Sequence, residues 1–146
     1  MRNMKKNDAL QVVAQAKKLQ NGEMQKVLLM VKKIPLDGDA IATSYLACGV
    51  DKALREDEEG LKKLVGASLI EEIEELHKQW HDDYYKIHEL YQKEKGLVSK
   101  LFGSQPKLTE LDQEKVINYS NDLKELTRKI IYKLEAAEGR LKLLRG

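Results

Sequence analysis

The chain has 146 residues, of which 34% are charged, and its 26 Lys and Arg residues nearly balance its 24 Asp and Glu residues. This length fits one domain. Positive and negative residues are interleaved along the chain, so it lacks the concentrated positive charge of a nucleic-acid-binding domain. No run approaches the ~20 apolar residues of a membrane span. Cys48 is the only cysteine, so no intramolecular disulfide forms, and we expect a reducing, cytoplasmic compartment.

Residues 1–59 predict a small bundle of three or four short helices. Asp8 can cap the first helix, and Asn21-Gly22 supplies a stop. A second helix follows and ends at Pro35, which cannot continue a helix. A third is weakened or broken at Gly49.

The step Gly49-Val50-Asp51 is similar to the turn of a helix-turn-helix motif. The stretch after it, residues 55–59, is acidic where a helix facing phosphates should be basic. We therefore favour a packing helix and do not expect a nucleic-acid partner. Cys48, just before this step, is expected to be a small buried residue.

Residues 60–146 predict a long antiparallel helical hairpin with a loop near 96–108. The first arm runs from Leu61 to about Lys95, and the second runs from its cap at Thr109 to Arg145. Core-type residues in each arm alternate at spacings of four and three, as in a coiled coil. In the second arm they are Val116, Ser120, Leu123, Thr127, Ile130, Leu134, Ala137, Leu141 and Leu144.

The connector of this hairpin is unusually apolar. Leu97, Val98, Leu101 and Phe102 recur at one-turn spacing where a plain linker would be polar. Either a short helix folds this patch back onto the hairpin, or the tip presents it to a protein partner.

All three histidines lie in the first arm, on one face of a helix. His77, His81 and His88 fall within about 40° of one another at 100° per residue, with Glu74 beside them. His77 and His81 are one turn apart, a spacing with which a helix holds one metal ion, whereas His88 is two further turns away. His77, His81 and Glu74 are candidate metal ligands, if another helix supplies a further ligand such as Glu110, Asp112 or Glu114. Histidines beside an apolar stripe are more often helix-surface residues paired with glutamate, which is the simpler interpretation.

Glu71, Glu72 and Glu75 form an EExxE pattern on the same arm. It resembles the first half of the magnesium site of the all-α nucleotide pyrophosphohydrolases, which implies carboxylates that bind a metal-bound diphosphate. The second half of that motif, ExxD on the next helix, is missing, because Gln113 and Glu138 stand where the aspartate should be. A glutamate-rich helix surface is the simpler interpretation.

These patterns predict an all-α protein with the bundle resting on the hairpin, in two parts or as one continuous domain. We expect a non-enzymatic, cytoplasmic interaction or assembly module that binds a protein or itself, with no catalytic residue and no cofactor unless a divalent metal binds. The alternatives are a metal-dependent all-α hydrolase and a DNA-binding regulator. The expected interaction residues are Leu97, Val98, Leu101, Phe102, Leu123, Ile130, Leu134 and Leu141.

Overall fold

The computed structural model describes residues 4–32, 48–101 and 109–144, and for residues 92–101 it describes the backbone alone. These residues form five helices and no strand, so the all-α prediction is confirmed. They are α1 (Lys6–Val31), α2 (Gly49–Arg55), α3 (Glu58–Val65), α4 (Ala67–Leu101) and α5 (Glu110–Lys142).

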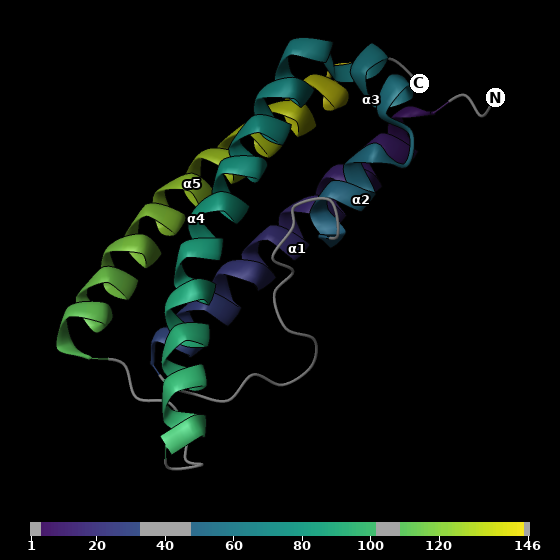
Figure 1. Cartoon of the computed structure of the whole chain (residues 1–146). Helices are drawn as coiled ribbons and strands as arrows, with labels where there is room; N and C mark the ends of the chain where they lie inside the picture. Colours follow the sequence, from purple (N-terminus) through teal and green to yellow (C-terminus); the bar gives the residue numbers. More distant parts are fainter. Residues whose placement is uncertain (1–3, 33–47, 102–108, 145–146) are drawn as a thin grey trace.

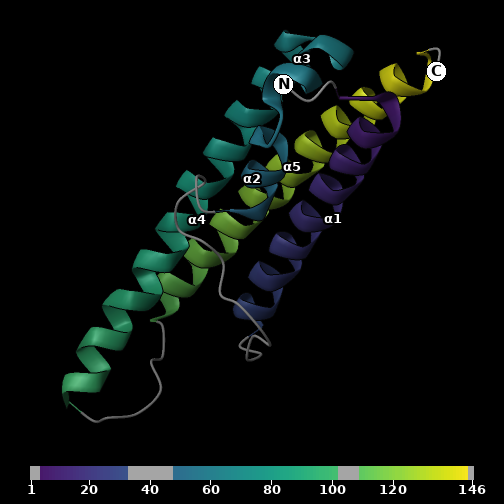
Figure 2. The ribbon, with the colours of Figure 1, turned by 90° about the vertical axis from the view of Figure 1, so that its right-hand side faces the viewer.

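The three long helices, α1, α4 and α5, lie side by side (Figures 1 and 2). Two contacts show that α4 and α5 run in opposite directions. Lys133 Nζ donates to Glu72 Oε2 at 2.7 Å, and Trp80, which follows Glu72 in α4, donates to Thr127, which precedes Lys133 in α5. At 1.5 Å per residue, the 35 residues of α4 extend about 50 Å.

α1 also packs along α5 in the opposite direction. Near its start, the Lys6 ammonium donates to the Leu144 carbonyl oxygen at 2.9 Å, and further on Lys17 pairs with Glu138 at 2.6 Å. At its other end, the Tyr91 hydroxyl of α4 donates to the Met30 carbonyl oxygen at 3.1 Å. α1 therefore contacts both long helices rather than only its neighbours in sequence.

The predicted stop at Asn21-Gly22 is wrong, because α1 continues through it as one 26-residue helix. Gly66 is the only glycine with a positive φ among the described residues, so Gly22 does not adopt the left-handed conformation of a helix stop. One glycine in a helix costs about 1 kcal/mol relative to alanine. Burial of apolar side chains on the same helix, among them Met24 and Val27, offsets this cost.

The predicted start of the first arm at Leu61, directly after Gly60, is also misplaced. Gly60 lies inside α3, and its backbone N–H donates to the side chain of Asp57, which caps that helix. The break falls instead at Gly66, whose φ of 99° is accessible to glycine and strained for other residues. The first long helix therefore begins at Ala67 and reaches Leu101, past the predicted start of the loop.

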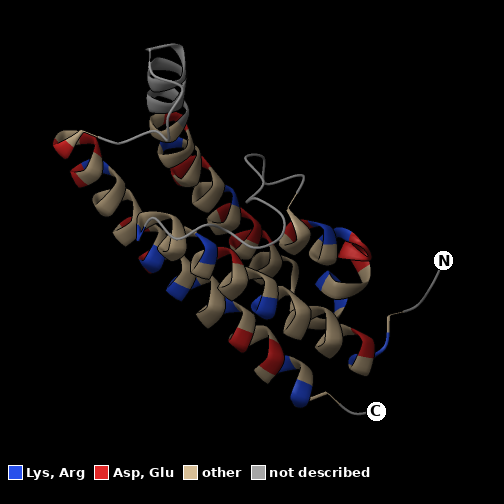
Figure 3. Ribbon diagram, turned by 90° about the horizontal axis from the view of Figure 1, so that it is seen from below, with Lys and Arg blue, Asp and Glu red and all other residues tan. Residues whose placement is uncertain are grey.

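One hydrophobic core includes residues from every described helix. The seam residues of α5 from Val116 to Leu141 are all buried, and Thr109 caps the helix as predicted, since its side chain accepts from the Asp112 N–H at 3.1 Å. Lys and Arg are interspersed with Asp and Glu along the helices (Figure 3). None of the described helices is long and apolar enough to cross a bilayer.

Candidate metal centre

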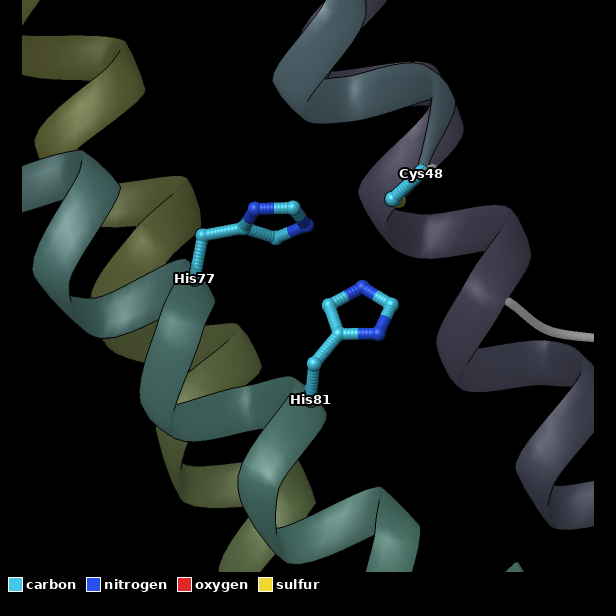
Figure 4. A group of neighbouring side chains, drawn as sticks. All are labelled: Cys48, His77 and His81. Atoms are coloured by element: carbon cyan, nitrogen blue, oxygen red, sulfur yellow. The ribbon is translucent and has the colours of Figure 1, made fainter. Parts of the chain in front are cut away.

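Cys48, His77 and His81 come together in the interior of the protein. One ligand atom from each of the three side chains lies within 4.8 Å of the other two. All three residues are buried, with 2% of Cys48 and 1% of each histidine exposed. The two imidazoles project from α4 toward the start of α2, where Cys48 lies (Figure 4).

α4 positions the two imidazoles. His77 and His81 are one turn apart on the helix, so their side chains leave it in nearly the same direction. Their ring centroids are 4.7 Å apart and the ring planes are inclined at 81°. The Trp80 ring packs against His81 at 5.0 Å and is itself held by the hydrogen bond from its Nε1–H to Thr127 Oγ1. Contacts with α5 thus help to fix the histidine pair.

The turn into α2 positions the thiol. Cys48 is the residue before the helix and has an extended backbone with φ −75° and ψ 140°. Next to it, Gly49 approaches α1 so closely that an added Cβ would lie 3.3 Å from a methyl carbon of Leu19. A side chain at this position would require Leu19 to shift by a few tenths of an ångström, so the glycine suits the close approach of α2 to α1.

Burial controls the ionisation of these ligands. It lowers the pKa of His77 to about 3, and the neighbouring His81 acts in the same direction. Burial likewise raises the pKa of Cys48 to about 11, helped by the charges of Glu23 and Asp51. At neutral pH His77 is therefore a neutral imidazole, ready to bind a metal, whereas the thiol must lose a proton.

Neither ring nitrogen of His77 has a hydrogen-bond partner among the described residues. Most buried polar atoms in proteins have such a partner, and leaving one without it costs about 1–3 kcal/mol. A metal ion would give one of these nitrogens its missing partner. The geometry of His77 therefore fits a ligand better than it fits a residue used only for packing.

The ligand types indicate which metal could bind. One thiolate and two imidazoles suit zinc and related transition metals, whereas magnesium and calcium prefer oxygen ligands. In tetrahedral zinc sites neighbouring ligand atoms are about 3.5 Å apart, given metal–ligand bonds of about 2.0–2.3 Å. The three ligand atoms lie within 4.8 Å of one another, so they would have to approach by no more than about 1 Å to bind one ion.

Glu74, the third predicted ligand, does not belong to this group of three residues. It is half-buried, and its carboxyl group lies beside that of Glu58 on α3. Burial, followed by the hydrogen bond to Glu58, raises the pKa of Glu74 to about 7. His88 is also elsewhere, stacked on Tyr85 with ring centroids 6.0 Å apart.

The other sequence-based candidates for metal ligands lie apart from the centre. Thr127 contacts Trp80, the neighbour of His81, so the histidine pair lies level with Thr127 on α5. The acidic start of α5, with Glu110, Asp112 and Glu114, is at least 13 residues earlier, which at 1.5 Å per residue is about 20 Å along the helix. The EExxE glutamates are exposed at the surface of α4. Glu72 pairs with Lys133 there, at 2.7 Å.

The predicted interaction residues of α5 are in the core. Leu123, Ile130, Leu134 and Leu141 have no exposed surface, so in this structure they contact other parts of the same chain. For the apolar tip, the side chains of Leu97, Val98 and Leu101 and the whole of Phe102 lie outside the described residues.

Cys48 is the candidate ligand that the sequence patterns did not indicate. Its burial was expected, but no short spacing connects it to His77 and His81, and a lone cysteine carries no ligand signature. Only the packing of α2 near α4 brings it to the histidines. No known protein family, curated protein or solved structure matches this chain, so the candidate site is defined by its own geometry.

Proposed function

We propose that this protein binds one transition metal ion, with zinc as the best match, through Cys48, His77 and His81. The observation that carries the proposal is the convergence of these three buried ligand atoms within 4.8 Å, from two separate segments of the chain. The unpartnered nitrogens of His77 support it.

Metal binding would join the start of α2 to α4. The unfolded chain does not bring these three side chains together. The ion would therefore bind mainly to the folded protein and stabilise it. Affinity should rise with pH, since Cys48 must lose its proton while His77 is already neutral. The metal ion would thus cross-link the start of α2 to α4 within one hydrophobic core.

Thermal unfolding with and without zinc tests this proposal. At a free zinc concentration 100 times Kd, binding adds about 2.7 kcal/mol, which for a chain of this size raises Tm by roughly 5–10 °C. Cys48→Ser and His77→Gln should lose this increase, because each removes a ligand. His88→Gln is the matched control and should keep it, since His88 lies outside the centre. An unchanged Tm for the wild-type protein would refute metal binding.

A protein-interaction function is the second proposal, with the coiled-coil-like pair of α4 and α5 as its platform. Several large apolar side chains of α5 and its C-cap are exposed, which favours it; they are Leu111, Ile117, Tyr132 and Leu143. An interface would have to use such surface residues or the tip at 97–102, because Leu134 and its buried neighbours already fill the core.

Light scattering tests this second proposal for self-association. The molar mass should exceed that of one chain, and Tyr132→Ser together with Ile117→Ser should lower it. A variant such as Leu134→Asp is unsuitable, because a charge in the core would unfold the chain whether or not it self-associates. A wild-type mass equal to that of one chain, with and without zinc, would exclude the homo-oligomer.

A further inference from the structure

We propose that the carboxylate of Glu23, on α1, is the fourth ligand of the metal ion, an inference that rests on the proposed metal function. The three residues of the centre leave one position of a tetrahedral site to be filled by a further protein group or by water. A site closed by four protein ligands is structural, whereas one with water in the fourth position is open to chemistry. The fourth ligand therefore decides what the site does.

The packing of α1 on α2 places Glu23 near the thiol. Leu19 lies against Gly49, and Glu23 is one turn further along the same face of α1. α2 runs opposite to α1, since Gln11 and Gln15, which precede Leu19, line a groove with Ala53 and later residues. Cys48, which comes before Gly49, therefore lies on the Glu23 side of this contact.

Electrostatic effects agree with this placement. The charge of Glu23 contributes to raising the pKa of Cys48, and it also contributes to raising that of Tyr84. Tyr84 is about one turn beyond His81 on α4. Glu23 thus influences groups on both helices that supply the ligands.

One oxygen of the Glu23 carboxylate also lacks a partner among the described residues. This oxygen, Oε2, is buried. Burial raises the pKa of Glu23, with the charge of Lys26 acting against the shift. A buried carboxylate oxygen without a partner is costly, and a metal ion would satisfy it.

Charge balance favours this ligand over water. A divalent ion with one thiolate and two neutral imidazoles leaves a net charge of +1 in a site whose three ligands are nearly inaccessible to solvent. Adding the Glu23 carboxylate makes the site neutral, which removes the cost of burying a charge. The oxygen of Glu23 is not within the 4.8 Å group, so its flexible side chain would turn toward the ion on binding.

Two other polar groups are weaker candidates. Asp51 is buried and also affects the pKa of Cys48, but its carboxylate is held by the guanidinium of Arg55. Gln20 is completely buried, and neither polar atom of its side chain has a hydrogen-bond partner among the described residues. An amide would leave the charge of the site unbalanced, so Glu23 is the better match.

Cobalt substitution tests the inference on the full-length protein. Co²⁺ in the wild-type protein should show a thiolate charge-transfer band and the intense visible bands of a tetrahedral site. Glu23→Gln, which keeps the shape but removes the charge, should weaken Co²⁺ and Zn²⁺ binding at least tenfold and change the visible bands. Asp51→Asn is the matched control for the loss of one nearby negative charge, and it should leave the band positions unchanged.

Azide gives a second measurement that does not depend on the variant folding. If Glu23 fills the fourth position, azide should not alter the Co²⁺ spectrum of the wild-type protein, and it should alter that of Glu23→Gln. An azide response in the wild-type protein would overturn the inference, as would a Glu23→Gln spectrum with unchanged bands. If wild-type protein shows no thiolate–Co²⁺ band at all, the proposed metal function itself fails.

Discussion

Replacing His77 by Leu should make the metal-free protein more stable while it abolishes metal binding. The wild-type imidazole is 1% exposed, and its two nitrogens have no hydrogen-bond partner among the described residues. Leucine is of similar size and has no polar atom, so it removes this penalty without opening a large cavity. The free energy of unfolding at pH 7 should rise by about 1–3 kcal/mol.

The pH dependence of stability gives an independent measure of the same substitution. In the unfolded chain His77 takes up a proton below its ordinary pKa of 6.5, whereas in the folded protein it does so only near pH 3. The unfolded state therefore binds more protons between these values, and stability falls as the pH falls through this window. The loss is about 1.4 kcal/mol per pH unit, and on the order of 5 kcal/mol in total. His77→Leu should lack this contribution.

Urea unfolding followed by circular dichroism, with a chelator present, measures both effects. The difference in free energy of unfolding between His77→Leu and wild type should grow as the pH is lowered from 7 to 4. His88→Leu is the control, because that histidine is only half-buried and lies outside the centre. A His77→Leu protein that is less stable than wild type at pH 7, or that shows no pH-dependent difference, would refute the idea that burial of an unsatisfied imidazole is costly here.

Three further predictions concern the scaffold. Thr127→Val should destabilise the protein by about 1–3 kcal/mol in urea unfolding, because it leaves the buried Trp80 N–H without its acceptor, whereas Thr127→Ser should retain most of the stability. Gly66→Ala should lower the free energy of unfolding by about 1–3 kcal/mol, since φ 99° is strained for alanine; a neutral result would show that the turn can relax. Gly22→Ala should instead raise Tm by a few degrees, with about 0.5–1 kcal/mol of added stability, because it lies in an exposed part of α1 with no atom within 4 Å of the new methyl group.

The position and buried face of α5 could be predicted from sequence because both depend on local patterns. Thr109 supplies the cap, and the four-and-three spacing marks the side of the helix that must be buried. The boundaries expected at Gly22 and Gly60 were wrong because there the local preference is weak and contacts from elsewhere in the chain decide the structure. A glycine costs only about 1 kcal/mol in a helix, and contacts made by distant parts of the chain outweigh that preference.

The sequence by itself identified two of the three residues of the candidate metal centre. His77 and His81 share one face of α4 because the helix brings residues four apart together, and this holds whatever surrounds the helix. The tertiary structure decided the rest: the burial of both imidazoles and the approach of Cys48, instead of Glu74, to them. These features depend on packing between segments far apart in the chain, for which no local spacing provides a signal.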